Sequence, residues 1–254
     1  MILRTSSEFK SDKPFVDVCL SPVFLDHFDK TNAIVVVIDV LRATSSMCIA
    51  LENGAEKIIP VATIEESMKY KEKGFLVGAE RNGLPVAGFD FGNSPFSFVG
   101  DNIKGSSIAI TTSNGTKAIS LAKGAKRIAV ASFLNLSAIS AWLKEQNSYT
   151  IILCSGWKDT FNLEDTLCAG AIVENLLGHF ELSINRDAAL AAQSMYKLAK
   201  DDLYAFLHHS SHAIRLEKLE INDDIKFCLT PDQTDVVPVL QDDALVSVRV
   251  KQSV

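Results

Sequence analysis

The 254-residue sequence lacks the features that mark membrane proteins and nucleic-acid-binding proteins. It has no apolar run of about 18 residues or more, the length that a membrane-spanning helix requires. It also lacks a face rich in lysine and arginine, because 25 basic residues are outnumbered by 31 acidic ones and the formal net charge is -6. A negative chain repels phosphate backbones, so we expect neither nucleic acid nor a membrane among its partners.

The sequence lacks paired cysteines, and its five copies are scattered along the chain. Cys19, Cys48, Cys154, Cys168 and Cys228 contain no CxxC pair, and four of them lie in apolar strand or helix contexts. This spacing is typical of free thiols in a reducing compartment and not of a disulfide framework. The N-terminal sequence MILRTSSEFKSDKP is polar and lacks the apolar core of a signal peptide. We therefore expect a cytoplasmic protein.

Several well-known catalytic motifs are absent as well. No GxxxxGKS or GxxxxGKT segment occurs, which excludes a P-loop nucleotidase, and no HExxH motif supports a zinc site. Cys154 is followed six positions later by Thr160 instead of an arginine, so a cysteine-nucleophile phosphatase loop does not fit. Asp39 follows an apolar run, as in the aspartyl-phosphate phosphatases, but Leu41 stands where their second aspartate would be. Asp39 is left as a metal ligand or as a nucleophile without that partner.

What the sequence does contain is a regular alternation of strand and helix patterns. Apolar, β-branched runs predict strands, and helical patterns that often end at glycine follow them. The predicted strands cover 15–20, 34–39, 57–61, 75–79, 106–110, 127–131, 149–154 and 245–250. Helices are predicted over about 22–28, 44–53, 63–73, 116–123, 136–145 and 163–177, with two more in 186–220. The alternation indicates a single α/β domain over 1–254, a three-layer α/β/α fold with a mainly parallel or mixed central sheet, either undivided or built as two strand–helix lobes sharing one cleft.

The stretch 33–46, AIVVVIDVLRATSS, carries the first group of polar side chains. Its apolar run predicts a strand buried on both faces, followed at once by Asp39, Arg42 and three hydroxyls at 44–46. Ligands of open α/β sheets bind beyond the carboxyl ends of the strands, so we expect a charged ligand here. The alternative is that Asp39 caps a turn and the hydroxyls cap the next helix.

Four later turns also follow predicted strands and carry polar side chains. They contain Glu80, Arg81 and Asn82; Asp90, Asn93 and Ser94; Thr111, Thr112, Asn114, Gly115 and Thr116; and Ser155 and Gly156 leading to Glu164 and Asp165. Carboxylates suit Mg²⁺, hydroxyls and N–H groups at a helix N-terminus suit phosphate, and arginine matches phosphate, sulfonate or carboxylate. Together these groups predict a magnesium-assisted reaction on a small phosphorylated acid.

An internal match raises the question of a repeat. The segments 49–58 and 119–128, offset by 70 positions, share the pattern IxLxxGAx(K/R)I, and each follows a predicted strand and a hydroxyl-rich turn. Any two strand–helix–strand units closed by a glycine can resemble each other, so chance is the alternative. If the match is structural, the two turns face one cleft.

Five segments occur in the order and at the spacing typical of one enzyme family. They read IDVLRATSS, GAERNG, GFDFGNSP, TTSNGT and NLEDTLCAGA, and over about residues 15–240 the chain resembles the 2-phosphosulfolactate phosphatase family. The resemblance implies a three-layer α/β/α fold, a cytoplasmic location, Mg²⁺ as cofactor and hydrolysis of the phosphate ester of a sulfonated hydroxy acid on the coenzyme M route. The expected partner is a small phosphorylated acid, and a homodimer is one candidate assembly.

The matching motifs imply functional residues, to which we assign roles as a hypothesis. Catalytic roles are assigned to Asp39, Arg42, Glu80 and Asp165, and a subset of Asp39, Glu80, Asp90 and Asp165 would hold the metal. Substrate contacts are assigned to Thr44, Ser45, Arg81, Asn93, Ser94, Thr112, Asn114, Gly115, Thr116 and Arg215. Cap or turn roles are the alternatives for Asn114 and for the Glu164–Asp165 pair, and 93–95 could be a helix entry only.

Near the C-terminus the family tends to show a SxHGRRL-like stretch, which here reads SSHAIRL from Ser210 to Leu216. One arginine is lost at Ile214, and this leaves the substrate's second acidic group undetermined. His212 is either a general acid or a packing histidine.

Two other functions are considered. One is the same phosphatase chemistry on a different phosphorylated carboxylic or sugar acid. The other is a non-catalytic binder of a phosphorylated or sulfonated metabolite, against which the carboxylates argue because they repel an anion unless a metal intervenes.

Overall fold

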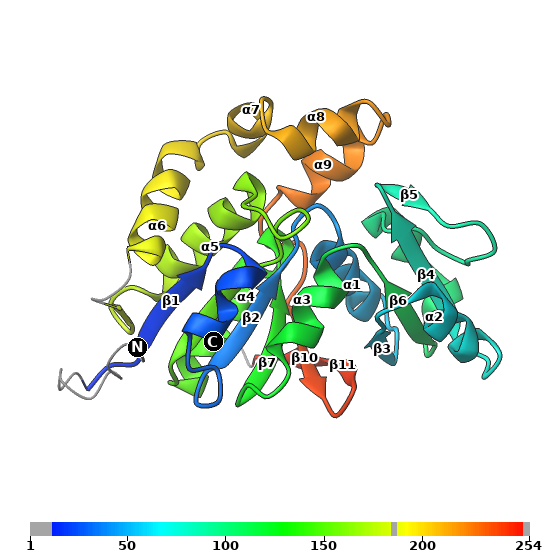
Figure 1. The fold of residues 1–254 in the computed structure, drawn as a ribbon, viewed down its shortest axis with the longest axis horizontal. Helices are drawn as coiled ribbons and strands as arrows, with labels where there is room; N and C mark the ends of the chain where they lie inside the picture. The colour runs from blue at the N-terminus through cyan, green and yellow to red at the C-terminus, as the bar shows by residue number, and fades with distance from the viewer. Residues whose placement is uncertain (1–11, 184–186, 251–254) are drawn as a thin grey trace.

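The computed structural model describes residues 12–183 and 187–250. Its strands are β1 Phe15–Cys19, β2 Ile34–Ile38, β3 Lys57–Pro60, β4 Leu76–Arg81, β5 Leu84–Pro85, β6 Ser107–Thr111, β7 Arg127–Ala131, β8 Thr150–Cys154, β9 Glu181–Leu182, β10 Val236–Gln241 and β11 Ala244–Arg249. They form one 11-stranded sheet in the order β5-β4-β6-β3-β11-β10-β7-β2-β8-β1-β9 (Figure 1). Most neighbours are parallel, so the predicted mainly parallel or mixed sheet is confirmed.

The α-helices are α1 Ala43–Glu52, α2 Ile64–Lys71, α3 Gly115–Ala122, α4 Leu136–Gln146, α5 Leu163–Leu176, α6 Ala188–Ala199, α7 Leu203–Leu207, α8 Ser211–Glu217 and α9 Asn222–Cys228. Short 3-10 helices are η2 Pro22–His27, η3 Pro95–Phe98, η4 Asp101–Ile103 and η5 Phe133–Asn135. In the described part of the chain, none of the helices combines the length and the apolar character needed to cross a membrane.

Strand β2 shows how the sheet separates two helical layers. Side chains of a strand alternate between its faces. Ile34, Val36 and Ile38 pack in a cluster with residues of α4, α5 and α6, whereas Val35 and Val37 pack in a cluster with residues of α1 and α3. All five side chains are buried, as predicted for a strand covered on both faces. The three-layer α/β/α fold is therefore confirmed.

The antiparallel hairpin β10–β11 lies in the middle of the sheet, between two parallel groups of strands. On one side Val239 pairs with Ala129 of β7, and on the other Leu245 pairs with Ile58 of β3, both antiparallel. Of this hairpin the sequence pattern predicts only the second strand. The group β4-β6-β3 thus joins the group β7-β2-β8-β1 through residues that come much later in the chain.

The prediction of two helices in 186–220 is wrong, since the described residues of that range form three. Position 186 itself lies outside the described residues. The Asp202 carboxylate accepts a hydrogen bond from the Ala205 N–H, and the Ser210 hydroxyl accepts one from the Ala213 N–H, so each residue caps a new helix. Together with α9, helices α7 and α8 form an arc over one end of the sheet (Figure 1).

The five cysteines are free and buried, which confirms the prediction of free thiols. Burial and the charge of Asp165 raise the pKa of the Cys154 thiol well above its usual 9.0. A thiol held neutral in this way is a poor nucleophile, in agreement with the spacing argument against a cysteine-based reaction.

Candidate active site

A cavity of about 290 Å³ lies where the five polar turns meet α8. Each turn contributes at least one lining side chain, and these include Asp39, Glu80, Asn93, Asn114 and Trp157. Both turns of the internal match line this cavity, as expected if the match is structural, but the other three turns line it too, so this does not distinguish a repeat from chance. The five polar turns therefore converge on one cavity.

Asp39 follows β2 directly and lies at the floor of this cavity, with only 7% of its surface exposed. Its N–H donates to the Thr44 hydroxyl at 3.0 Å, and that hydroxyl donates to the Asp39 carbonyl at 2.8 Å, which fixes the turn. Burial, the charge of Asp165 and the charge of Glu80 raise the pKa of Asp39 to about 8, against the opposing influence of His212. The carboxylate is thus held in a place that destabilises its own negative charge.

Gly115, the first residue of α3, allows the helix end to approach Asp39. A Cβ added at Gly115 would lie 2.8 Å from the nearer Asp39 carboxylate oxygen and 2.7 Å from the Ala43 Cβ. The positive end of α3 therefore lies beside the carboxylate, where it also favours a bound phosphate. Gly115 is therefore required because a larger residue would not fit between α3 and Asp39.

Gly115→Ala is expected to lower kcat by about 10-fold or more, because the new methyl group displaces either the Asp39 carboxylate or the start of α3. It should also lower the free energy of unfolding by about 1–3 kcal/mol, the usual cost of overpacking. Steady-state kinetics and urea unfolding measure the two effects. Gly78→Ala is the control, because its added Cβ would meet Ile110 at an ordinary 3.4 Å. Unchanged kinetics for Gly115→Ala would contradict the close approach.

Glu80 and Arg81 are neighbours on β4, and only Glu80 lines the cavity. The two Glu80 carboxylate oxygens accept hydrogen bonds from the Gly83 N–H at 2.5 Å and the Ser113 N–H at 3.3 Å. Arg81 instead donates to the Thr111 hydroxyl at 3.1 Å and to its own strand's carbonyl at Glu80. The alternation of side chains along a strand explains this separation, and Arg81 is not brought to the site.

Most of the predicted hydroxyl ligands are buried and bonded within their own turns. The Ser45 hydroxyl donates to the Val40 carbonyl at 2.8 Å, while Thr44 bonds Asp39 as described. Thr112 and Thr116 bond each other: the Thr116 N–H donates to the Thr112 hydroxyl, and the Thr112 N–H donates to the Thr116 hydroxyl, both at 3.2 Å. All four hydroxyls therefore stabilise their own turns, and for Thr44 and Ser45 a structural function of this kind was the alternative to ligand binding.

Arg42 lines the cavity, but its guanidinium is already engaged. One Nη group is ion-paired with the Asp224 carboxylate, and the other donates to the Gly83 carbonyl at 2.9 Å. The second Asp224 oxygen accepts from the Ser94 hydroxyl at 3.0 Å. Arg42, Ser94 and Asp224 thus tie three distant segments together. The same Arg42 side chain also lines a neighbouring cavity of about 850 Å³.

Two of the predicted acidic ligands do not line the cavity. Asp165 is fully buried below it, where one oxygen accepts from the Val40 N–H at 2.9 Å and the other from the Gly156 N–H at 3.2 Å. Asp90 accepts from the Val77 N–H at 2.9 Å and pairs with the Lys71 ammonium at 3.2 Å. Asp165 joins two of the turns, and Asp90 belongs to a partly exposed surface pair.

One wall of the cavity comes from α8, where the spacing of His212, Arg215 and Leu216 places them on one face, and Leu219, just after the helix, extends this wall. The Arg215 guanidinium lies over the Trp157 ring, 4.3 Å from its centroid. Its Nε and one Nη are buried without a hydrogen-bond partner. An arginine stacked on an aromatic ring with unused donors is suited to receive an anion. Trp157 and Lys158 were not predicted, although they follow β8 in one of the polar turns.

Comparison with known sequences found a matching family and several relatives. A model of the family described as 2-phosphosulpholactate phosphatase matches residues 20–243. A probable 2-phosphosulfolactate phosphatase of Caldanaerobacter subterraneus is 38% identical over 234 residues, covering 86% of this chain and 96% of that protein. One of Thermotoga maritima is 44% identical over 205 residues, covering 81% and 88%. The chain belongs to the 2-phosphosulfolactate phosphatase family.

The departure of this chain from the family's C-terminal stretch has little effect on the cavity. Ile214 stands where the family tends to have the first of two arginines, and it is 38% exposed and does not line the cavity. Ala213 is buried behind the same helix. The retained Arg215 is the one that faces the site, so the cation available to an anionic substrate is preserved in this member of the 2-phosphosulfolactate phosphatase family.

The residues fit a magnesium ion that is held partly by substrate, not one enclosed by protein ligands alone. Among residues 12–183 and 187–250, no group of three or more His, Cys, Asp or Glu side chains is placed to hold a metal. Asp39 and Glu80 nevertheless line the same cavity. After burial and Asp165, Glu80 is a further cause of the raised pKa of Asp39, and a divalent cation would relieve that repulsion. Mg²⁺ commonly uses one or two carboxylates together with phosphate and water.

The free energy of unfolding is expected to fall between about pH 4 and pH 8 in metal-free buffer. Burial raises the pKa of Asp39 to about 8, and burial with the charge of Glu164 raises that of Asp165 to about 7, from an ordinary 3.8. Since the folded protein holds these protons more tightly than the unfolded chain, their ionisation lowers stability, on the order of 1 kcal/mol per pH unit for each group. Thermal unfolding across this range measures the decline.

Added Mg²⁺ should raise the melting temperature more at about pH 8 than at about pH 5, because it binds the ionised carboxylate only. Asp39→Asn should flatten part of the metal-free decline and remove the Mg²⁺ response. A melting temperature that rises steadily with pH in the absence of metal would contradict the raised pKa values.

Proposed function

We propose that this cavity hydrolyses the phosphate ester of 2-phosphosulfolactate with Mg²⁺ as cofactor, giving sulfolactate and phosphate. Family membership supports the reaction class and the substrate. The observation that carries the site assignment is the presence in one cavity of buried Asp39 and of Arg215, whose Nε and one Nη are buried without a hydrogen-bond partner. A cavity of about 290 Å³ suits a small acid that carries a phosphate, a sulfonate and a carboxylate.

In this proposal Asp39 and Glu80 hold the Mg²⁺, which when bound neutralises phosphoryl oxygens and lowers the pKa of a coordinated water. The first turn of α3, next to Asp39, receives the phosphate through its positive end. Asn114 stays at the rim, because its side-chain oxygen accepts from the Lys158 N–H at 3.2 Å and fixes the loop that carries Trp157. These contacts hold the ester phosphorus near the cavity floor.

Arg215 and Lys158 bind the sulfonate at the far end of the substrate. Both cations lie over the Trp157 ring, with Lys158 Nζ 5.6 Å from its centroid, and both line the cavity. Stacking on the ring restricts the position of the guanidinium and leaves its N–H donors available to the substrate. Arg42 is already paired with Asp224, so in this proposal it shapes the rim of the cavity and does not bind the substrate's charge.

The test is a substrate panel with Mg²⁺ present or removed by EDTA. Phosphate release is measured with 2-phosphosulfolactate, with 2-phospholactate, which replaces the sulfonate by hydrogen, and with p-nitrophenyl phosphate. Metal-dependent turnover with the highest kcat/KM for 2-phosphosulfolactate is expected. If no compound gives metal-dependent phosphate release, the result favours the non-catalytic binder. If the protein prefers an unsulfonated acid, that acid and not 2-phosphosulfolactate is its substrate.

Arg215→Ala adds a residue-level check. It should raise KM for 2-phosphosulfolactate by about 10-fold or more, because a charge-assisted contact is lost, and change KM for 2-phospholactate much less. Arg249→Ala is the matched control, since that arginine pairs with Glu52 at the surface.

The cytoplasmic location, the homodimer and the single-domain organisation over 1–254 stay predictions. The free, buried thiols support the first.

A further inference from the structure

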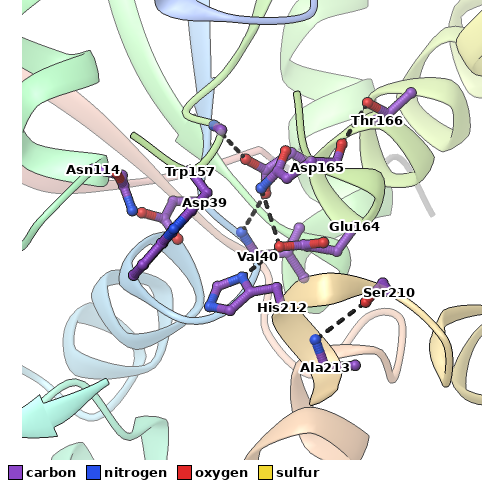
Figure 2. Close-up of polar contacts among 12 residues, drawn as sticks. Asp39, Val40, Asn114, Trp157, Glu164, Asp165, Thr166, Ser210, His212 and Ala213 are labelled. Atoms are coloured by element: carbon purple, nitrogen blue, oxygen red, sulfur yellow. Dashed lines mark hydrogen bonds and ion pairs between the residues drawn. The ribbon is translucent and has the colours of Figure 1, made fainter. Parts of the chain in front are cut away.

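His212 and Glu164 form a buried hydrogen-bonded pair at the edge of the cavity. His212 Nδ1 lies 2.5 Å from Glu164 Oε1, and the two side chains are 10% and 1% exposed. The same Glu164 oxygen accepts from the Asn162 side-chain amide at 3.1 Å. Figure 2 shows the imidazole between Glu164 and Asp39, with one nitrogen directed at the glutamate and the other on the opposite side of the ring. The ring is therefore held in one orientation by a neighbour that is itself fixed.

The pair defines which His212 nitrogen carries a hydrogen toward the glutamate. Burial opposes the charge of Glu164, but the hydrogen bond and charge of His212, together with the Asn162 amide, hold the pKa of that carboxyl below its ordinary value. An ionised carboxylate can only accept a hydrogen bond, so Nδ1 is the donor. Nε2 has no hydrogen-bond partner among the described side chains and backbone groups, and His212 lines the cavity.

The surroundings of His212 place its ring between two carboxylates at the wall of the cavity. The Glu164 carboxylate lies on one side of the ring and Asp39 on the other (Figure 2). Trp157 packs against the ring at a centroid distance of 5.5 Å, and the cations Arg215 and Lys158 lie over the same indole. Of these charged groups, Glu164 is the one that forms a hydrogen bond with the imidazole.

The reaction proposed above needs a proton donor for the leaving alcohol oxygen, and none of the groups assigned so far supplies one. The leaving group is the oxygen of a secondary alcohol, a strong base that departs slowly unless it is protonated as its bond to phosphorus breaks. The carboxyl groups of Asp39 and Glu80 are assigned to the cation, and arginine and lysine hold their protons too tightly. A histidine facing the cavity is the remaining titratable side chain suited to this step.

We propose that His212 donates the Nε2 proton to the leaving alcohol oxygen and that Glu164 acts as its positioning residue. This inference rests on the proposed phosphatase function. The oxygen of water forms a bond to phosphorus, the bond from phosphorus to the alcohol oxygen breaks, and its electron pair takes the proton from Nε2. The products are the free hydroxy acid and hydrogen phosphate, and the second proton of the attacking water returns through solvent to His212. Atoms and charge balance without a further reactant.

The decisive experiment compares two leaving groups in His212→Asn. On 2-phosphosulfolactate, kcat should fall about 100- to 1000-fold, the usual contribution of general acid catalysis. On p-nitrophenyl phosphate the loss should be under about 10-fold, because p-nitrophenolate is a weak base and departs without a proton. Equal losses on both substrates would overturn the proton-donor role.

Glu164→Gln tests the positioning residue, since the amide can keep a hydrogen bond but not the charge. It should lower kcat on 2-phosphosulfolactate by about 10- to 100-fold, with a smaller loss on p-nitrophenyl phosphate and little change in KM. The ratio of the two kcat values is the readout, because a merely structural defect lowers both together. An unchanged ratio in this variant would remove Glu164 from the inference.

His208→Asn is the matched control. His208 also contacts a glutamate through Nδ1, at 3.3 Å from Glu217, but its side chain is 55% exposed and does not line the cavity. Its kinetics should match those of the unaltered protein on both substrates. If the unaltered protein releases phosphate from neither substrate, the proposed function fails. If it hydrolyses both and His212→Asn loses them equally, only the role of His212 fails.

Discussion

Asp39→Asn is expected to lower kcat about 1000-fold or more while the protein stays folded. The substitution preserves the size of the side chain and removes the charge that would hold the cation at the cavity floor. The fold should persist because the turn is fixed by backbone and Thr44 contacts, not by the carboxylate. Neutralising a carboxylate whose pKa burial has already raised to about 8 also removes an unfavourable charge. Stability should therefore be equal or slightly higher.

The measurement is phosphate release with saturating Mg²⁺, accompanied by circular dichroism and thermal unfolding. Asp90→Asn is the matched control, since that carboxylate was also predicted as a ligand but accepts from Val77 N–H and pairs with Lys71. It should retain kcat within about threefold, as expected for a surface ion pair. Near-normal magnesium-dependent turnover in Asp39→Asn would remove Asp39 from the site.

Asp224→Ala is expected to lower the free energy of unfolding by about 3–5 kcal/mol. Arg42 and Asp224 are ion-paired with side chains only 5% and 9% exposed, and they connect segments 182 positions apart. Removing the carboxylate leaves the guanidinium buried with only the Gly83 carbonyl as a partner. It also frees the Ser94 hydroxyl. The expected loss comes from the unpaired buried charge more than from the value of the pair itself.

Urea unfolding measures this loss, and two variants make it specific. Asp243→Ala removes a carboxylate from the exposed pair with Lys123, where the aspartate is 76% exposed, and should cost under about 1 kcal/mol. The double variant Arg42→Met, Asp224→Leu removes both charges and should be more stable than Asp224→Ala. If Asp224→Ala and Asp243→Ala destabilise the protein equally, the buried pair has no special weight.

The strand pattern and the turn chemistry could be read directly from the sequence because both are local. The run Ile34–Ile38 predicts a doubly buried strand, and Asp39 follows it, so the floor of the cavity was predictable. The separation of Glu80 from Arg81 was also within reach, because neighbouring strand residues face opposite sides. The sequence around Glu80 and Arg81 does not show which face of β4 the cavity lies on.

The remaining parts depend on contacts between distant segments. Nothing near Asp224 in the sequence marks it as the partner of Arg42. Hydroxyls such as Thr112 and Thr116 can bind phosphate or stabilise their own turn, and only the structure reveals the reciprocal bonds between them. His212 could be a packing residue or an acid until its distance to Glu164 is known. Local chemistry therefore predicts candidates, and tertiary contacts assign them.

The central position of the β10–β11 hairpin has a consequence for synthesis on the ribosome. The hairpin is translated after every other described strand, yet it separates the strand group that carries Asp39 from the group that carries Glu80. A nascent chain that ends before residue 236 contains all the proposed metal-binding and substrate-binding residues but not the strands that join the two groups. We therefore expect the two groups to stay incompletely joined until the hairpin leaves the exit tunnel, so that catalytic competence appears late in translation.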